Sequence, residues 1–314
     1  MTADNKKLTG KIIKATGGFF YVFVKADTNT PAVTQNKTGG FSNGMVIECK
    51  AKGIFKKSGI SPCCGDNVVV AVQESGYCVI EEVLQRKNHL VRPPLANLDL
   101  LAVVVSADEP KINYSVLDKL LAVCRSKNIP SVVIITKTDL SQSAAEQAAE
   151  IYTKAGISVF SFCREDNSST EQIKNFLHGK TAAFAGNSGV GKSTLLNALL
   201  PGLQLQTGEI SKKLGRGRHT TRTVELFDTG YCHIADTPGF STVDLQRYNI
   251  SDAADLQYCF EEFEQYLGKC QFTSCTHICE KGCAVLQALA DGEITQSRHK
   301  SYVDIYGEIK TNKK

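Results

Sequence analysis

A short glycine-rich segment in the second half of the chain has the residue types and spacing that bind phosphate. Gly186-Asn-Ser-Gly-Val-Gly191-Lys192-Ser193 fits the pattern G-x-x-x-x-G-K-[ST], between an apolar strand pattern and an apolar helical pattern. The glycines let backbone N–H groups turn toward phosphate oxygens, and the helix N-terminus adds positive potential. We predict that Lys192 reaches the β- and γ-phosphates and that the Ser193 hydroxyl holds Mg²⁺.

A second phosphate-sensing element lies further along the chain. Asp236-Thr-Pro-Gly239 follows an apolar strand pattern and matches D-x-x-G, in which Asp236 would hold Mg²⁺ through water and the Gly239 amide would sense the γ-phosphate. The Gly-rich segment 215–222 lies between this element and the phosphate loop, and we interpret it as the first switch segment of a GTPase. Such a segment needs a hydroxyl that can close on Mg²⁺. We choose Thr221 as the second Mg²⁺ ligand, with Thr220 as the alternative.

The base-specificity element precedes the phosphate loop instead of following it. Thr136-Lys137-Thr138-Asp139 fits [NT]-K-x-D at the end of a strand pattern. Asp139 would accept the guanine N1 and N2 hydrogens, which adenine does not offer, and Lys137 would lie along the base. Phe162-Cys163, at the end of the next strand, is the second base loop. The order is therefore circularly permuted, but all these loops still meet at the carboxyl edge of one parallel sheet.

Three thiols and an imidazole cluster near the C-terminus, as Cys270-x4-Cys275-x-His277-x5-Cys283. Zn²⁺ takes four N or S ligands tetrahedrally, and this set leaves no open position, so we predict one structural zinc ion. Cys279 is a competing fifth candidate, which we interpret as a bystander that could substitute for a ligand.

Composition limits the class of protein. The chain has 314 residues, 42% hydrophobic and 22% charged, which is typical of a globular protein of two or three domains. The net charge of +4 permits a nucleic-acid partner without requiring one. The N-terminus lacks the apolar core of a secretory signal, and no apolar run approaches the ~20 residues of a membrane span. We therefore expect a cytoplasmic protein with reduced cysteines that acts without a membrane.

The spacing of apolar residues predicts three kinds of structure in succession. Residues ~8–85 show short strands, including one at 53–57, separated by glycine-containing turns, which favours an OB-like barrel. Residues 86–97 break this pattern and are interpreted as a linker. Strands then alternate with helices, with Ser141 as a plausible N-cap, and predict a parallel α/β sheet. After about residue 244 the strand signals stop, and residues ~250–306 are expected to be helical.

In this joint order of motifs, the sequence resembles the bacterial ribosome small-subunit-dependent GTPase A family. The segment Arg86-Lys-Asn-His-Leu-Val-Arg-Pro-Pro-Leu-Ala-Asn-Leu-Asp99 is similar to that family's linker motif. The resemblance implies an α/β fold: an OB-fold RNA- and ribosome-binding domain (1–86), a circularly permuted P-loop GTPase domain (87–247) and a helical zinc-binding domain (248–314). It also implies GTP hydrolysis stimulated by the small ribosomal subunit, late in the maturation of that subunit, with switch changes coupled to rRNA binding and release. The domains form a closed set, which suggests a monomer.

The predicted nucleotide-binding residues are Thr136, Lys137, Thr138, Asp139, Phe162, Cys163, Gly186, Asn187, Ser188, Gly189, Val190, Gly191, Lys192, Ser193, Thr194, Asp236 and Gly239.

Two positions depart from the family pattern. Thr136 stands where the family usually has Asn, whose side chain ties the specificity loop to the phosphate loop. Thr supplies only a shorter hydroxyl, so we expect weaker guanine discrimination or affinity, but not its loss, because Asp139 remains. Phe162-Cys163 replaces the commoner Ser-Ala or Ser-Ser, although a backbone N–H there could still contact the guanine carbonyl.

The residue after D-x-x-G is Phe240, where many GTPases have the Gln that orients the attacking water. Intrinsic hydrolysis should therefore be slow, and His219 is our candidate for positioning water, as the resemblance also suggests. Two alternatives stay open. A P-loop kinase or ATPase would bind adenine and have no use for residues 136–139. A non-catalytic RNA-docking module would show no turnover even with ribosomal subunits present.

Overall fold

The computed structural model describes residues 7–25, 44–55, 59–73, 76–200, 224–237, 243–248 and 250–312. The chain forms two compact units. One unit comprises Met1–Asp99, Phe176–Ala183 and Leu205–Pro238, and the other comprises Leu100–Asn175, Phe184–Gln204 and Gly239–Lys314. The three-domain division with boundaries at 86 and 247 stays a prediction.

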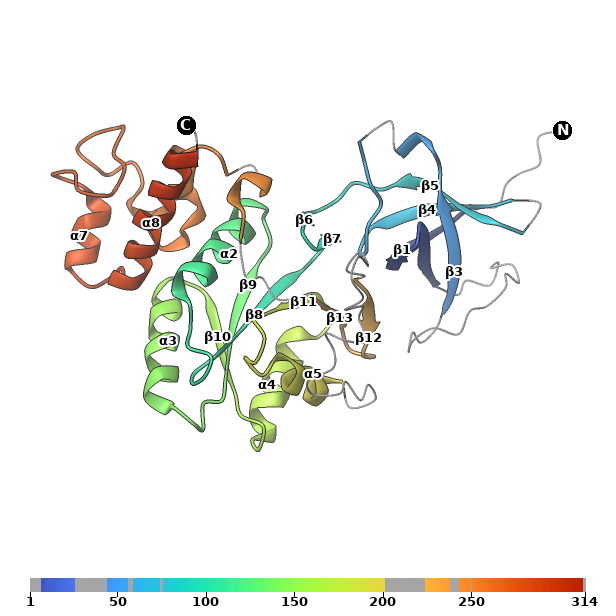
Figure 1. Ribbon diagram of the computed structural model, residues 1–314, viewed down its shortest axis with the longest axis horizontal. Helices are drawn as coiled ribbons and strands as arrows, with labels where there is room; N and C mark the ends of the chain where they lie inside the picture. The colour runs from blue at the N-terminus through green and yellow to red at the C-terminus, as the bar shows by residue number, and fades with distance from the viewer. Residues whose placement is uncertain are drawn as a thin grey trace. The chain divides into compact units, whose positions relative to one another are not determined.

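Five strands of the first unit close into a barrel, as the strand spacing predicts (Figure 1). The strands are β1 (Lys7–Thr16), β2 (Phe19–Lys25), β3 (Gly44–Ala51), β4 (Asn67–Val72) and β5 (Cys78–Val83). Their order around the barrel is β1-β2-β3-β5-β4, in which β3 and β5 are parallel and the other paired strands are antiparallel. Because the barrel is closed, it leaves no unpaired edge strand.

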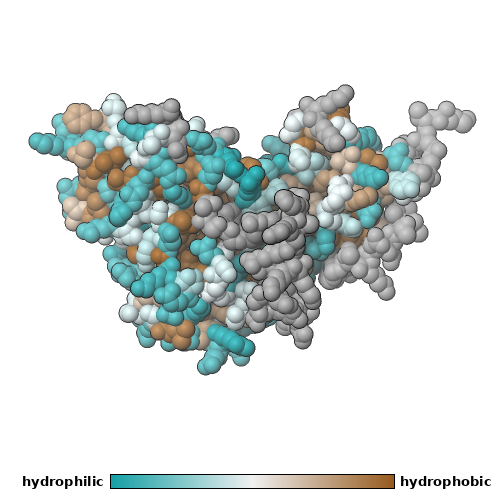
Figure 2. Space-filling view, viewed as in Figure 1, coloured by the Kyte–Doolittle hydropathy of each residue, from teal (hydrophilic) through white to brown (hydrophobic). Residues whose placement is uncertain are grey.

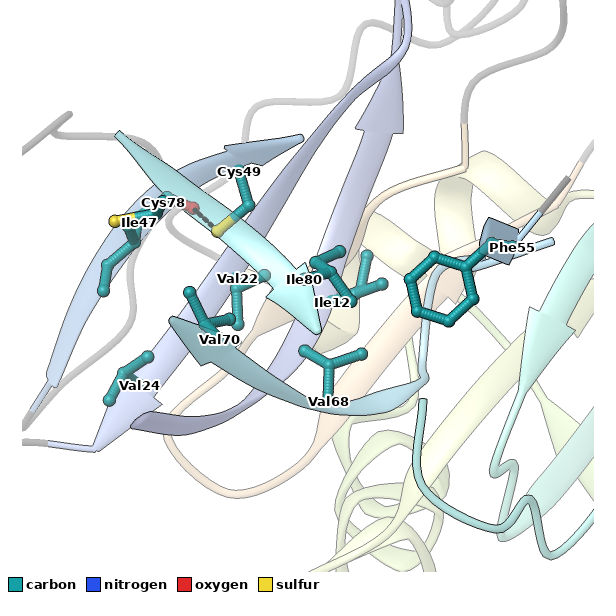
Figure 3. Packing of buried hydrophobic residues seen from close by; sticks show 10 residues of the cluster. All are labelled: Ile12, Val22, Val24, Ile47, Cys49, Phe55, Val68, Val70, Cys78 and Ile80. Carbon is teal, nitrogen blue, oxygen red and sulfur yellow. Dashed lines mark hydrogen bonds between the residues drawn. The ribbon is translucent and has the colours of Figure 1, made fainter. Parts of the chain in front are cut away.

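The barrel core consists of the residues that point inward at every second position of the strands (Figure 3). Fully buried members are Ile12, Val22, Ile47, Val68, Val70 and Ile80. Phe55 also belongs to this cluster, but the predicted strand at 53–57 is wrong for its described part, residues 53–55. Residue 53 lies in a turn and residues 54–55 are helical. Phe55 N–H donates to the Lys52 carbonyl oxygen at 3.2 Å, and the Phe55 ring is buried against the barrel core.

The predicted linker is a structured part of the first unit. It contains a two-stranded hairpin, β6 (His89–Val91) and β7 (Pro94–Ala96). Before the hairpin, Arg86 makes a two-pronged ion pair with the fully buried Asp66, with N–O distances of 2.7 and 2.8 Å. Beside it, Gly65 (φ +90°) approaches the linker so closely that an added Cβ would lie 2.0 Å from the Ala96 carbonyl oxygen, so only glycine fits there.

A six-stranded sheet has the order β10-β9-β8-β11-β13-β12. Its strands are β8 (Leu100–Ser106), β9 (Ser131–Thr136), β10 (Ser158–Phe162), β11 (Thr181–Ala185), β12 (Leu226–Asp228) and β13 (His233–Asp236). The pairs β8–β9 and β9–β10 are parallel, while β12 and β13 are antiparallel. The intervening helices are α2 (Tyr114–Ser126), α3 (Gln142–Lys154), α4 (Asn167–Leu177) and α5 (Lys192–Leu199). The predicted alternation of strands and helices is confirmed, although Ser141 occupies the N-cap position of α3 without a side-chain capping bond.

The C-terminal region is helical, as expected, but part of its helical structure is 3₁₀-helix and not α-helix. Three 3₁₀ segments come first: η1 (Leu245–Tyr248), η2 (Ala253–Cys259) and η3 (Glu261–Tyr266). The α-helices α7 (Ala284–Ala290) and α8 (Gln296–Asn312) follow, and α8 extends beyond the predicted end at about residue 306. Helix α8 runs beside α2 (Figure 1).

A buried ion network joins α2, η3 and α8 within the second unit. Arg298 donates to Asp118 at 2.6 Å and to Glu262 at 2.7 Å, and all three side chains are at most 4% exposed. The Tyr152 hydroxyl also donates to Asp118, at 3.0 Å, and the Arg298 guanidinium lies 4.6 Å from the centre of the Phe260 ring. Charges buried this deeply are tolerated only when paired, so the network fixes α8 against α2.

In the view of Figure 2, the described residues show hydrophilic side chains interspersed with groups of hydrophobic ones. Among the described residues, no helix combines the length and apolar character that a membrane span needs. All twelve cysteines lie in the described ranges, and each is free.

Candidate nucleotide site and metal centre

The predicted phosphate loop connects β11 to α5 and follows the backbone of β8 closely. At Gly186 an added Cβ would lie 2.7 Å from the Val104 carbonyl oxygen, so a larger residue would push the loop away from β8. Gly189 and Gly191 have φ angles of +85° and +84°, which favour glycine. Asn187, Ser188 and Gly189 are exposed, while Val190 is buried and anchors the loop.

Three predicted phosphate and magnesium residues begin α5. Gly191 is the N-cap of this helix, and Lys192, Ser193 and Thr194 form its first turn, each half-buried. The first N–H groups of a helix point outward along its axis, so a helix N-terminus can donate hydrogen bonds to phosphate oxygens. The Ser193 hydroxyl, in this turn, is of the hard oxygen type that suits Mg²⁺.

The specificity loop is fastened to the phosphate loop by Thr136. Its hydroxyl lies 2.5 Å from the Val190 carbonyl oxygen and 3.1 Å from the Val105 carbonyl oxygen, and the side chain is 1% exposed. Thr136 therefore makes a link to the phosphate loop of the kind that the family resemblance implies for Asn. A Cβ added at Gly191 would lie 3.1 Å from this hydroxyl, so the two loops are in close contact.

The other base-loop residues lie at the same edge of the sheet. Lys137 has a left-handed φ of +56° and donates through Nζ to the Glu109 carbonyl oxygen, while Thr138 is half-buried and Asp139 is exposed. Phe162, the last residue of β10, is buried and lies opposite Thr136 in the parallel register. Cys163, half-buried, follows it, and its carbonyl oxygen accepts from the Asp166 amide at 3.2 Å.

The remaining predicted residues are only partly placed. Asp236, half-buried, is the last residue of β13 and belongs to the first unit, whereas the phosphate and base loops belong to the second. Gly239, His219, Thr221 and its alternative Thr220 lie outside the described residues. Their predicted roles are therefore not tested by the structure.

Cys270, Cys275, His277 and Cys283 place their ligand atoms within 4.8 Å of one another. Cys270 Sγ lies 3.9 Å from Cys283 Sγ and 3.6 Å from His277 Nδ1, which in turn lies 3.4 Å from Cys283 Sγ. Tetrahedral bonds of about 2.3 Å to sulfur separate ligand atoms by about 3.8 Å. These four residues thus fit a tetrahedral metal ion, whereas Cys279 is exposed and outside the group.

Neighbouring side chains hold the metal loop in its ligand geometry. His277 Nε2 lies 2.9 Å from Gln257 Oε1, so the proton belongs on Nε2 and Nδ1 is left as the ligand nitrogen. Burial lowers the pKa of His277, which favours this neutral form. From α8, His299 Nε2 donates to the His277 carbonyl oxygen at 2.7 Å, and the Tyr302 hydroxyl donates to the Thr276 carbonyl oxygen at 2.9 Å.

Comparison with known protein families agrees with this arrangement. The family described as RsgA GTPase matches residues 83–246, and the RsgA N-terminal domain matches residues 37–80. The chain belongs to the RsgA GTPase family. The matched residues include the linker, the specificity loop, the phosphate loop and D-T-P-G.

Relatives within the RsgA family match almost the whole chain. It is 42% identical over 310 residues to the small ribosomal subunit biogenesis GTPase RsgA 1 of Listeria monocytogenes serotype 4b (strain F2365), covering 98% of this chain and 99% of that protein. It is 38% identical over 309 residues to the small ribosomal subunit biogenesis GTPase RsgA of Bacillus subtilis (strain 168), covering 97% and 98%.

Two solved structures are also similar along their full lengths. The crystal structure of YloQ, a circularly permuted GTPase, is 32% identical with a TM-score of 0.75, covering 99% of this chain and 98% of that one. The crystal structure of YjeQ from Thermotoga maritima is 30% identical with a TM-score of 0.77, covering 97% and 99%. The circularly permuted RsgA fold inferred from motif order is therefore confirmed.

Sequence reasoning missed several residues that build these RsgA sites. The Glu109 carbonyl oxygen, which binds Lys137, lies in a loop without a recognisable motif. Gln257, His299 and Tyr302 support the metal loop from positions up to 26 residues away in the chain. The only available signal for the Glu109 loop was its position at the carboxyl end of β8, where parallel sheets bind ligands.

Proposed function

We propose that this protein hydrolyses GTP to GDP and phosphate and that it assists late maturation of the small ribosomal subunit, which stimulates the hydrolysis. The observation that carries the proposal is the attachment of the specificity loop to the phosphate loop through Thr136 and Val190. Relatives named as small ribosomal subunit biogenesis GTPases, alignable over 97% or more of the chain, support the choice of ribosomal partner.

Each predicted nucleotide residue has a distinct role in this proposal. The glycine-rich loop and the first turn of α5 hold the phosphates with N–H groups, and Lys192 offsets their negative charge. Asp139 accepts the guanine hydrogens, and Lys137 lies along the base. Ser193 and Thr221 would hold Mg²⁺, which would supply positive charge beside the phosphates.

The water-positioning group in this proposal is His219. A phenylalanine at position 240 cannot hydrogen-bond water, so hydrolysis without the ribosomal subunit is expected to be slow. Replacement of His219 by Ala should leave GDP affinity unchanged and lower the turnover number measured with small subunits by about 100-fold or more. An unchanged turnover number would remove His219 from the mechanism.

The metal proposed for the Cys₃His group is a single zinc ion with a structural role. Three thiolates and one imidazole satisfy all four positions of a tetrahedral ion, which leaves no site for substrate or water. The set Cys270, Cys275, His277 and Cys283 would then hold residues 270–283 in one conformation. Soft sulfur ligands favour zinc over magnesium or calcium at this position.

The proposed partners are GTP or GDP and the small subunit with its rRNA, without a membrane. The barrel is suited to RNA because its surface strands carry basic and aromatic side chains such as Lys50, whose Nζ lies 5.2 Å from the centre of the Phe19 ring. We propose that the protein acts as a cytoplasmic monomer and that changes in the switch segments are coupled to RNA binding and release.

Nucleotide competition and subunit binding test the two halves of this proposal separately. Unlabelled GTP and GDP should displace fluorescently labelled GDP from the purified protein, whereas ATP should not. Displacement by ATP as effective as by GDP would favour the kinase or ATPase alternative.

In the presence of a non-hydrolysable GTP analogue, the protein should sediment with small but not large ribosomal subunits. Equal sedimentation with both would contradict the assignment to the small subunit.

A further inference from the structure

The loop between β8 and α2, residues 107–113, contacts both nucleotide loops of the second unit. The Glu109 carbonyl oxygen accepts a hydrogen bond from Lys137 Nζ of the specificity loop. The next residue, Pro110, borders the phosphate loop: its Cδ lies 3.6 Å from the position that a Cβ on Gly189 would occupy. The β8–α2 loop is therefore placed to influence the specificity loop and the phosphate loop together.

Ser106 sets the shape of this loop. It is the last residue of β8, is 1% exposed, and lies opposite Thr136 in the parallel register of β8 and β9. Its hydroxyl accepts from the Asp108 amide at 3.3 Å and donates to the Glu109 carbonyl oxygen at 3.4 Å. A serine hydroxyl that bonds nearby backbone groups in this way imitates a turn and fixes the direction of the peptide groups.

Packing beneath the β8–α2 loop is incomplete. A cavity of about 40 Å³ is lined by Ser106 and Pro110 on one side and by Gly186, Asn187 and Val190 of the phosphate loop on the other. This volume exceeds what one water molecule needs. The cavity leaves part of the loop without packing contacts, so we assign part of the loop's position to its polar contacts.

The side chain of Lys137 is anchored by the β8–α2 loop. Its backbone is held in the left-handed region, with φ +56°, but a lysine side chain on its own samples many rotamers. The bond from Nζ to the Glu109 carbonyl oxygen restricts those rotamers. A lysine stem that is already extended loses less conformational entropy when a base packs along it.

We propose that Ser106 is a positioning residue for guanine-nucleotide binding. Its hydroxyl fixes the Glu109 carbonyl group, and this carbonyl group anchors Lys137 beside the base. The inference rests on the proposed function, because it concerns how the same nucleotide site is built. It adds the β8–α2 loop to the specificity, phosphate and switch elements as a fourth structural part of the site.

A double-mutant cycle tests whether Ser106 acts through Lys137. The dissociation constant of GDP is measured for the wild type, Ser106→Ala, Lys137→Ala and the double variant. Ser106→Ala alone should raise the dissociation constant about three- to tenfold, as expected for the loss of one modest hydrogen bond. In the Lys137→Ala background the same substitution should raise it less than twofold, because the anchored side chain is gone.

The matched control is Ser131→Ala. Ser131 begins β9 at the opposite end of the sheet, and its hydroxyl donates to the Ile129 carbonyl oxygen at the same distance of 3.4 Å. This variant should bind GDP like the wild type. If Ser106→Ala binds GDP as tightly as the wild type, or weakens binding equally in both backgrounds, the inference is overturned while the proposed function stands. Absence of GDP binding by the wild type would instead refute the proposed function and the inference with it.

Hydrogen exchange on the wild-type protein provides a test that does not depend on the folding of a variant. On addition of GDP, amides in residues 107–112 should become more protected, together with those of the specificity and phosphate loops. Protection of the specificity and phosphate loops without any change in residues 107–112 would overturn the inference.

Discussion

The hydroxyl of Thr136 lies 2.5 Å from the Val190 carbonyl oxygen in the phosphate loop and 3.1 Å from the Val105 carbonyl oxygen at the end of β8. A hydroxyl carries one proton, so these two acceptors share a single donor. The pair Thr136–Val190 ties the predicted guanine-specificity loop to the phosphate loop, and we predict that nucleotide affinity depends on this bond.

Removing only this hydroxyl should weaken nucleotide binding. Thr136→Val keeps the side-chain shape but leaves the Val190 carbonyl oxygen without its donor, so GDP affinity should fall about tenfold. Thr136→Asn supplies two N–H donors for the two carbonyl groups and should raise GDP affinity above that of the wild type. Titration calorimetry measures both, and equal affinity of the valine variant and the wild type would disprove the role of the bond.

The buried network around Arg298 should dominate the stability of the second unit. Arg298→Met leaves the carboxylates of Asp118 and Glu262 buried without their counter-charge, and should lower the free energy of unfolding by about 3–5 kcal/mol. Arg125→Met is the matched control, because Arg125 pairs with Glu264 at the surface and should contribute less than about 1 kcal/mol. Urea unfolding gives both values, and similar losses in the two variants would contradict the special role of burial.

Metal content should depend on the four predicted ligands and not on Cys279, the fifth candidate ligand of the region. The wild type should contain one zinc ion per chain, and Cys275→Ala should lose it and unfold at a lower temperature. Cys279→Ala should keep both the metal and the wild-type melting temperature, because Cys279 is exposed and outside the ligand group. Elemental analysis after gel filtration measures the metal content of the wild type and of both variants. Loss of metal in both variants would show that Cys279 is a ligand.

His233 should make stability fall as the solution becomes mildly acidic. Burial lowers the pKa of His233 below its ordinary value of 6.5, and the nearby charge of Lys11 lowers it further. Between the lowered folded value and 6.5 the unfolded chain binds more protons, so the free energy of unfolding decreases as pH falls through this interval. The His233→Gln variant lacks this contribution.

The pH dependence is measured as the difference between wild type and His233→Gln in urea unfolding, from about pH 8 to about pH 5. The stability of the wild type relative to the variant should decrease as pH is lowered past 6.5, and should level off below the folded pKa. If the difference in free energy of unfolding between wild type and variant stays constant from about pH 8 to about pH 5, His233 has the same pKa in the folded and unfolded states.

Features governed by local spacing were predictable from sequence. In the barrel strands, every second residue points into the core, as Val68 and Val70 do. The phosphate loop and the Cys₃His group are defined by short, fixed spacings between residues in the sequence. The permuted order was predictable as well, because each loop follows a recognisable apolar strand.

Features that depend on distant residues were not predictable. Asp118 and Arg298 are 180 positions apart, and neither has a neighbour in sequence that signals burial of its charge. In the linker hairpin, His89 pairs with Ala96 across a turn that contains two prolines. From the sequence, the prolines were expected only to interrupt the strand pattern. The 3₁₀ segments of residues 245–266 share their apolar spacing with α-helix, so their type was decided by tertiary packing.

The proposed GTPase activity is tested by the rate of GTP hydrolysis. This rate is measured for the purified protein alone, with small ribosomal subunits and with large subunits. We predict slow hydrolysis by the protein alone, strong stimulation by small subunits and none by large subunits. Unchanged hydrolysis in the presence of small subunits, with GTP binding intact, would contradict this prediction and leave a nucleotide-binding protein that docks without catalysing.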